Sequence, residues 1–291
     1  MSFPPSVKRN MWGMEFPSPL MLASGTAGFG RELLNLGCLE GVGAVVSKAV
    51  TLKPREGNPP PRVQETAYGL LNSIGLANPG VEAVLDQLLP QVSDLPCPLL
   101  INVAGETADE YPAVVELLDS SSVPMGYEIN VSCPNVASGG RAFGVEPSVV
   151  ETVSSMVARV TEKPFTVKLT PNGGDMVEAA LAAESGGASA VTVCNTFLGM
   201  HIDWRTGKTV IKRKVAGYTS PALLPLVVAA VWKVASEVSI PVISSGGVSS
   251  GEDVLELLAA GAEMVQVGTR LMRRPWAAGE LMAEIEDLLT T

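Results

Sequence analysis

Short apolar segments recur along the whole chain, each bounded by glycine, proline or asparagine. Each segment is rich in Val, Ile or Leu at both odd and even positions, which is typical of strands buried on both faces of a parallel sheet. Eight such segments are present, and we predict strands at residues 20–24, 44–50, 99–103, 127–132, 165–170, 190–195, 241–245 and 264–268.

Longer segments with the periodicity of amphipathic helices separate these strands. The predicted helices are residues 81–91, 108–118, 147–161, 175–185, 223–237, 252–260 and 275–289. Eight strands alternating with helices predict an α/β fold of the (β/α)8 TIM-barrel type. An open doubly wound sheet is the alternative, but it rarely uses eight such evenly spaced strands. No linker or charge run divides the chain, so we predict a single barrel domain over residues 1–291.

The fourth predicted strand runs directly into a cluster of reactive side chains. Asn130, Ser132, Cys133 and Asn135 follow one another there, and Pro134 ends the strand by removing a backbone donor. Ligands of parallel α/β proteins bind at the carboxyl ends of the strands, which favours a binding site at this point. Ser, Asn and Pro are also ordinary turn residues, and this stretch alone does not separate the two interpretations.

Composition and charge exclude several classes of function. The net charge is −10 without a basic run, which argues against nucleic acid as a partner. No apolar stretch reaches about 18 residues, and the first residues lack a leader pattern, so we expect a soluble cytoplasmic protein with no membrane partner. The four cysteines lie far apart, and His201 is the single histidine, which argues against a metal site, an iron-sulfur cluster or a histidine triad in this chain.

Two lysines lie within apolar predicted strands, and burying them is costly unless each has a partner. Lys48 and Lys168 would both face the same barrel mouth, which indicates an anionic ligand. The alternative is a structural ion pair with Glu65, Glu128 or Asp203.

Glycines follow both of the last two strands. Gly246 and Gly247 follow the seventh strand, and Gly268 with Thr269 follows the eighth. At these two positions of a barrel, free backbone N–H groups commonly bind a phosphate. The earlier glycines at residues 25–30 have the wrong spacing for a dinucleotide-binding loop, and we predict a turn there.

A phosphate site, a buried lysine and several amides together favour flavin mononucleotide (FMN) as cofactor. Lys168 would place positive charge near the pyrimidine end of the flavin, where negative charge collects on reduction. The amides of Asn72, Asn130 and Asn195 match the donors and acceptors of a cyclic ureide. Either Lys48 or these amides could hold a substrate carboxylate. Cys133 could act as base, because a free thiol has a pKa of about 8.5.

Two long connections follow the second and sixth strands, at residues 51–80 and 197–220. Long loops in compact domains are usually functional or disordered, and these are placed to form walls of a site. We expect His201, in the second of them, to be a solvated residue of such a lid.

Eight short motifs along the chain together match one known family: residues 22–26, 55–62, 72–80, 129–136, 168–172, 195–196, 246–248 and 268–269. On these motifs the chain resembles the class 1 dihydroorotate dehydrogenases over nearly its whole length, and within them the class 1B catalytic subunits. Residues 139–144 look like class 1B and unlike class 1A, and a cysteine at position 133 separates class 1 from class 2, which uses serine.

The resemblance implies a barrel that binds FMN and oxidises (S)-dihydroorotate to orotate in de novo pyrimidine biosynthesis. Cys133 would remove the C5 proton while hydride passes from C6 to flavin N5. Substrate would contact Lys48, Asn72, Ser73, Ile74, Gly75, Leu76, Asn130, Asn195 and Thr196. FMN would contact Ser24, Lys48, Ala49, Asn102, Asn130, Lys168, Cys194, Ser220, Gly246, Gly247, Gly268 and Thr269.

The resemblance also implies partners. Class 1B subunits pair with a second chain that carries FAD and a 2Fe-2S cluster and passes electrons to NAD. A homodimer, and with the partner a heterotetramer, is therefore expected.

Two positions depart from the family pattern. Ser220 replaces a glycine in a loop that is one residue short, which puts that loop's part of the flavin pocket in doubt. Cys194 stands where an aliphatic residue is more common, and we interpret it as a small core residue in preference to a second reactive thiol.

Three alternatives remain open: a class 1A-like enzyme that uses fumarate, a related dihydropyrimidine dehydrogenase, and a catalytically silent barrel that acts as a scaffold.

Overall fold

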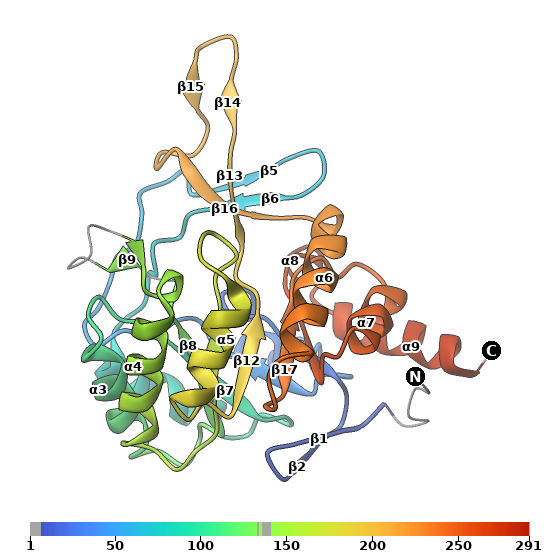
Figure 1. Cartoon of the computed structure of the whole chain (residues 1–291). Helices are drawn as coiled ribbons and strands as arrows, with labels where there is room; N and C mark the ends of the chain where they lie inside the picture. The colour runs from blue at the N-terminus through green and yellow to red at the C-terminus, as the bar shows by residue number, and fades with distance from the viewer. Residues whose placement is uncertain (1–6, 133, 136–140, 291) are drawn as a thin grey trace.

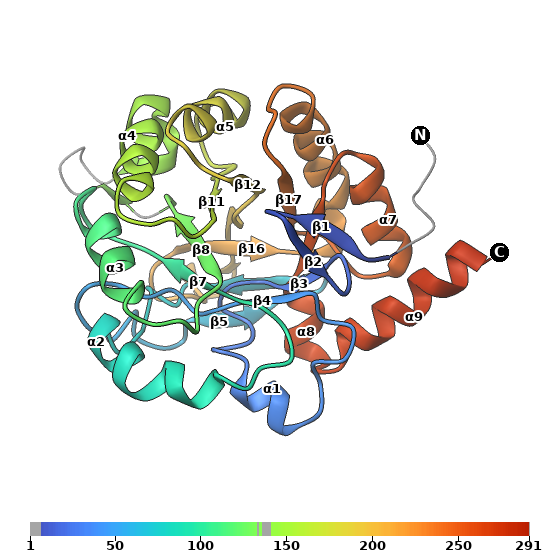
Figure 2. The same ribbon diagram turned by 90° about the horizontal axis from the view of Figure 1, so that it is seen from below.

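The computed structural model describes residues 7–132, 134–135 and 141–290. Eight parallel strands close into a barrel in chain order (Figure 2). They are β3 (Leu20–Leu22), β4 (Ala44–Val46), β7 (Leu99–Val103), β8 (Gly126–Asn130), β11 (Phe165–Lys168), β12 (Ala190–Val193), β17 (Val242–Ser245) and β18 (Met264–Val267). Each coincides with a predicted strand, so the predicted (β/α)8 barrel is confirmed. Several strands end earlier than predicted, and Lys48 lies two residues beyond β4 and not within it.

Helices surround the barrel at the predicted places (Figures 1 and 2). The longer ones are α3 (Glu110–Leu118), α4 (Pro147–Ala158), α5 (Met176–Ser185), α6 (Leu224–Ala235), α7 (Gly251–Ala259) and α9 (Ala277–Thr290). Their starts follow local chemistry: the Asp175 carboxylate accepts from Val177 N at 2.8 Å, and Ser250 forms a capping box with Asp253.

Three helical segments differ from prediction. The predicted helix at 81–91 is instead α2 (Val81–Ala83), a π turn η1 (Val84–Leu88) and a 3-10 turn η2 (Leu89–Val92). Pro90 has no N–H to continue a regular helix, which explains the change of winding. Helices α1 (Arg31–Asn35) and α8 (Thr269–Arg273) were not predicted, because five residues are too few to show a helical period. Two further 3-10 turns are η3 (Phe143–Val145) and η4 (Pro221–Leu223).

Alternation along the strands creates two apolar cores. Outward residues such as Ile101, Tyr127 and Val191 pack with the helices in the larger core. Inward residues such as Leu100 and Ile243 form a smaller core inside the barrel. Toward the carboxyl ends of the strands the inward-facing residues are polar. The apolar core inside the barrel therefore ends there, and a candidate binding site begins.

A short hairpin closes the amino-terminal end of the barrel. It consists of β1 (Arg9–Met11) and β2 (Met14–Phe16), whose residues Met11 and Phe16 join the inner core. Trp12 Nε1 donates to the Ser189 carbonyl at 2.9 Å and so ties the hairpin to the barrel.

The two long connections meet at the opposite end. They form one antiparallel sheet in the order β13 (Phe197–Met200), β16 (Val215–Thr219), β6 (Leu70–Asn72) and β5 (Val63–Glu65). This sheet stands over the carboxyl ends of the barrel strands (Figure 1), as expected for the walls of a site. A second small pairing joins β9 (Pro134–Asn135) and β10 (Arg141–Ala142).

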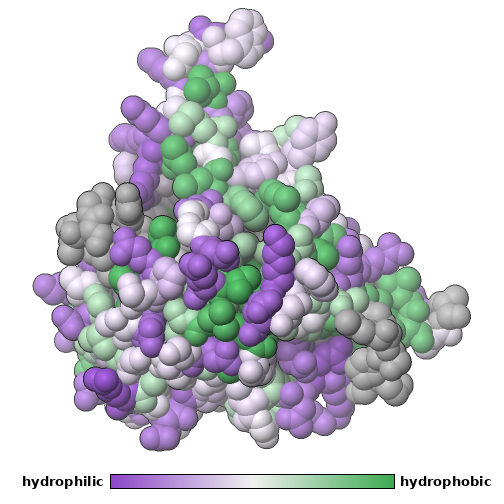
Figure 3. All heavy atoms as spheres, in the orientation of Figure 1, coloured by the Kyte–Doolittle hydropathy of each residue, from purple (hydrophilic) through white to green (hydrophobic). Residues whose placement is uncertain are grey.

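An arm projects from this sheet away from the barrel. Strands β14 (Ile202–Asp203) and β15 (Lys208–Thr209) form its tip (Figure 1). His201 is exposed at its base, as predicted. Apolar and polar side chains alternate over the arm (Figure 3), and Trp204 at the tip is 79% exposed.

Within the described part of the chain, no helix combines the length and the apolar character needed to cross a membrane.

Candidate active site

A cavity of about 930 Å³ lies between the carboxyl ends of the barrel strands and the antiparallel sheet. Its volume is at the upper end of the range for ligand sites. It is lined by all twelve residues predicted to contact FMN, namely Ser24, Lys48, Ala49, Asn102, Asn130, Lys168, Cys194, Ser220, Gly246, Gly247, Gly268 and Thr269. The fold thus brings together residues from both ends of the chain.

Lys168 forms part of the cavity lining and is only 6% exposed. Its ammonium donates to Gln266 Oε1 at 2.9 Å and to Glu128 Oε1 at 3.3 Å. The structural ion pair considered above therefore exists for this lysine, with Glu128 as partner. The other two carboxylates have different partners: Glu65 pairs with Arg273, and Asp203 accepts from residues of its own turn.

Lys48 is half-buried in the wall of the cavity, just beyond β4. Burial, together with the nearby charge of Arg62, lowers the pKa of this lysine from its ordinary value. No described residue accepts a hydrogen bond from its ammonium. Lys48 is therefore available to bind an anion in the cavity.

Asparagine side chains form one side of the cavity. Asn195 Nδ2 donates to Asn130 Oδ1 at 3.1 Å, and the same oxygen accepts from Ser132 N at 3.2 Å. Asn195 Oδ1 accepts from Thr196 N at 2.8 Å. Asn130 Oδ1 thus accepts two hydrogen bonds and has no lone pair left, whereas the Nδ2 group of Asn130, one N–H of Asn195 and one lone pair of Asn195 Oδ1 are left for a ligand.

The sheet over the cavity places the predicted substrate segment. Asn72, Ile74 and Leu76 line the cavity, and Asn72 Nδ2 donates weakly to the Gly217 carbonyl at 3.4 Å. Ser73 and Gly75 do not line it. Ser73 Oγ instead accepts from Asn58 Nδ2 at 2.9 Å, on the other side of the segment.

The glycine loops after β17 and β18 also line the cavity. Gly246 and Gly247 have φ values of 125° and 84°, which an L side chain rarely adopts. A Cβ on Gly247 would stand 2.6 Å from Leu224 Cα. The backbone N–H groups of Gly246, Gly247, Gly268 and Thr269 donate to no described residue, so four donors are free in this part of the cavity.

Arg270, the next residue along, is fixed by two carboxylates. Although burial lowers its pKa, hydrogen bonds with Glu284 at 2.8 Å and Glu280 at 3.1 Å raise the pKa above its ordinary value overall. Arg270 and Glu284 both line the cavity, so the positive charge of the guanidinium is balanced there by its partner carboxylates.

The structure accounts for both residues that depart from the family pattern. Burial raises the pKa of the Cys194 thiol to about 12, with Lys168 opposing the shift, so the thiol is protonated and behaves as a small core side chain. Ser220 Oγ donates to the Tyr68 carbonyl at 2.6 Å and accepts from Ala222 N at the start of η4. The predicted base, Cys133, lies outside the described residues.

Sequence reasoning missed several cavity residues. Gln266 interrupts an apolar strand as Lys168 does. A polar residue within an apolar strand is a signal that could have identified Gln266 as a candidate site residue. Arg62 and Tyr218 line the cavity from connections whose pairing no local pattern indicates, and Arg273 lines it from α8, which is too short to show a helical period.

The fold is a barrel with a cavity at the carboxyl ends of its strands, and free backbone N–H groups suited to a phosphate line that cavity. These features define a barrel enzyme that binds an anionic ligand. The family model for dihydroorotate dehydrogenase matches residues 6–289, and the chain belongs to this family.

Curated relatives cover nearly the whole chain. It is 43% identical over 277 residues to the dihydroorotate dehydrogenase B (NAD(+)), catalytic subunit, of Bacillus pumilus, covering 95% of this chain and 89% of the relative. It is 48% identical to the subunit of the same name in Thermoanaerobacter sp., covering 95% and 91%. A crystal structure of DHODH from Eimeria tenella in complex with ferulenol has a TM-score of 0.78 at 22% identity, covering 99% of this chain and 85% of that one, which is a likeness of fold.

Proposed function

We propose that this chain is the catalytic subunit of an NAD-linked dihydroorotate dehydrogenase, a cytoplasmic, single-domain enzyme of pyrimidine biosynthesis that oxidises (S)-dihydroorotate to orotate. The observation that carries the proposal is the convergence of Lys48, Lys168, the asparagine amides and the glycine loops on one cavity. The relatives named dihydroorotate dehydrogenase B support the same activity.

The residues of the cavity fit FMN. Asn102 Oδ1 is buried without a hydrogen-bond donor, and the pyrimidine portion of a flavin carries an N–H group. Lys168 has one N–H left after its two contacts, and the loops after β17 and β18 offer backbone donors for a phosphate. When bound, FMN would supply the hydride acceptor for the reaction.

The remaining cavity residues suit a small anionic ureide. We propose that the Lys48 ammonium binds the carboxylate of dihydroorotate, while Asn72, Asn130 and Asn195 contact its ring amides. Thr196, Ile74 and Leu76 would form the walls that exclude water. Ser73 and Gly75 would support this segment from behind. Cys133 would take the C5 proton, as the resemblance implies.

Lys48 donates to no described residue, which favours a carboxylate-bearing substrate over a neutral pyrimidine. An anaerobic mixture of the FMN-loaded chain with dihydroorotate should bleach the visible flavin absorbance, and uracil or dihydrouracil should leave it unchanged. A flavoprotein that stays yellow with dihydroorotate would refute the substrate. Cys133→Ala should retain flavin and lose turnover, and normal turnover at neutral pH would refute the assigned base.

We further propose that the chain forms a homodimer and pairs with an electron-transfer subunit carrying FAD and a 2Fe-2S cluster. The apolar side chains exposed on the arm support an interaction surface of this kind. After reduction by dihydroorotate, the isolated chain should be reoxidised slowly by NAD. Rapid reoxidation by fumarate would instead indicate a class 1A-like enzyme.

A further inference from the structure

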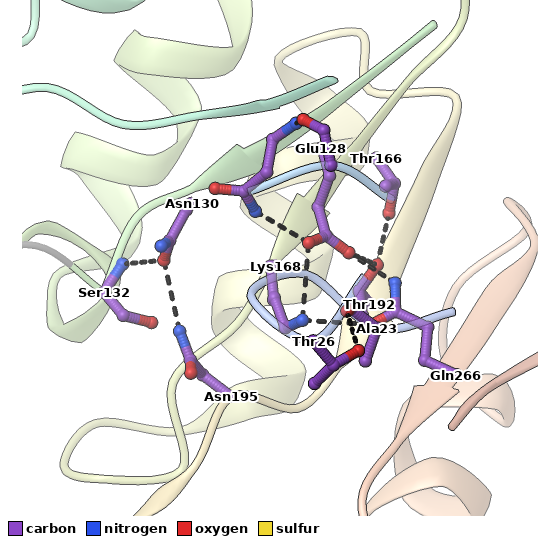
Figure 4. Close-up of polar contacts among 12 residues, drawn as sticks. Ala23, Thr26, Glu128, Asn130, Ser132, Thr166, Lys168, Thr192, Asn195 and Gln266 are labelled. Carbon is purple, nitrogen blue, oxygen red and sulfur yellow. Dashed lines mark hydrogen bonds and ion pairs between the residues drawn. The ribbon is translucent and has the colours of Figure 1, made fainter. Parts of the chain in front are cut away.

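Glu128 is a fully buried carboxylate inside the barrel that does not itself line the cavity. Its side chain points inward from β8 toward side chains of four other strands (Figure 4). Oε1 accepts from Asn102 Nδ2 at 2.7 Å and from Lys168 Nζ at 3.3 Å. Oε2 accepts from Gln266 Nε2 and, at 3.4 Å, from Thr192 Oγ1. Every group facing this carboxylate is therefore a donor.

Glu128, Gln266 and Lys168 form a closed triangle of contacts. Because Gln266 Nε2 donates to Glu128, its Oε1 is turned toward Lys168, from which it accepts at 2.9 Å. A lysine side chain has four flexible bonds, and here its end is held at two points. The one N–H that remains is the part of Lys168 available to a ligand in the cavity.

The same triangle fixes the charge near the cavity. Glu128 and Lys168 are both almost completely buried, and each is the counter-charge of the other. A buried charge with its partner removed is strongly unfavourable, so the pair holds the ammonium in place. At the same time the carboxylate offsets part of the positive field that Lys168 projects into the cavity.

We propose that Glu128 is a positioning residue for the flavin: it holds the Lys168 ammonium in place and sets how much positive charge reaches the ring. This inference rests on the proposed function, since it requires FMN in the cavity. It predicts that Glu128 tunes how readily the bound flavin accepts negative charge, although Glu128 lies one layer away from the cavity lining.

Sulfite offers a test that does not use dihydroorotate. It binds reversibly to oxidised flavins and leaves negative charge on the ring, so its dissociation constant reports the local field. The FMN-loaded wild type would be compared with two variants. Glu128→Gln keeps the size of the side chain and removes its charge. Gln266→Met removes the amide of Gln266, the uncharged member of the triangle, and leaves both charges in place. Glu256→Gln on the exposed face of α7 is the matched control for the loss of one charge. The midpoint potential of the flavin would be measured for the same proteins.

In Glu128→Gln we expect the sulfite dissociation constant to fall about tenfold and the potential to rise, because the ammonium is no longer offset. In Gln266→Met we expect that constant to rise about threefold, because Lys168 loses the acceptor that aims it. Glu256→Gln should match the wild type.

Unchanged sulfite affinity and potential in variants that retain flavin would overturn the role of Glu128 and leave the proposed function intact. The amide oxygen of the glutamine can still accept from Lys168, so weaker sulfite binding in Glu128→Gln would overturn the charge-setting role of Glu128. If Glu128→Gln does not fold, the sulfite affinity and midpoint potential of Gln266→Met alone test the proposal. A wild-type chain that binds no FMN would refute both the proposed function and this inference before sulfite is added.

Discussion

Asn78 holds the predicted substrate segment against Thr51, in the connection that follows the second barrel strand. Its Nδ2 donates to Thr51 Oγ1 at 2.8 Å and to the Leu76 carbonyl at 2.7 Å. Its Oδ1 accepts from Gly80 N at 2.9 Å and from Thr51 N at 3.3 Å. Asn78 and Thr51 are 8% and 3% exposed, so water does not replace these contacts in the folded protein.

Asn78→Ala removes all four hydrogen bonds. At about 0.5–1.5 kcal/mol each, their sum lies between about 2 and 6 kcal/mol. Because the adjacent Pro79 is exposed, water can enter the space that the amide leaves and satisfy some of the freed N–H groups. We therefore expect a loss near the lower end, about 3 kcal/mol in the free energy of unfolding, and a higher KM for dihydroorotate as Leu76 loosens.

Urea denaturation of the wild type and the variant at pH 7, followed by far-ultraviolet circular dichroism, measures the free energy of unfolding. Steady-state kinetics measures the KM for dihydroorotate. Asn10→Ala, at an exposed position of β1, is the matched control and should change stability by less than about 0.5 kcal/mol. A loss below about 1 kcal/mol in Asn78→Ala would show that the four contacts do not hold the segment, and the reasoning would fail.

Three further outcomes are expected. The Cys194 thiol has its pKa raised from about 9 in the unfolded chain to about 12 on folding, so stability is lost as pH rises above 9. Between pH 8 and 10 the wild type should lose about 1.4 kcal/mol more than Cys194→Val in urea denaturation, and equal losses would contradict burial of the thiol. Gly247→Ala should weaken FMN binding at least about tenfold by equilibrium dialysis, because its Cβ would overlap Leu224, whereas Gly207→Ala, at a similar positive φ with open space, should bind FMN normally. Ser250→Ala should cost about 1 kcal/mol of stability by loss of the α7 cap, and an unchanged melting temperature would refute that value.

The barrel could be predicted because its strands are local patterns. Eight apolar runs with helical segments between them leave few alternatives, and the structure places a strand in every one. Polar residues at the ends of those runs, such as Lys168 and Asn130, could be found for the same reason. The pairing of Lys168 with Glu128 was foreseen only as one of several candidates, because the choice among carboxylates depends on which strands are neighbours.

The sheet over the cavity could not be predicted. Its strands β5, β6, β13 and β16 are three to five residues long and mostly half-exposed, so they lack a clear alternation. Their pairing depends on the barrel bringing two distant connections together. Arg62 and Tyr218 enter the cavity through that sheet, which is why no local signal identified them.

The shared sheet has a consequence for the order in which the protein is built. Strand β6 pairs with β16, and Asn72 meets Gly217 across a separation of 145 residues. On the ribosome, β6 therefore has no β16 to pair with until six barrel strands have been synthesised. Contacts of such long range close late, because the chain between them must first be ordered. The cavity should thus be among the last parts of the molecule to form, and a nascent chain that ends before residue 215 should contain most of the barrel yet hold no flavin.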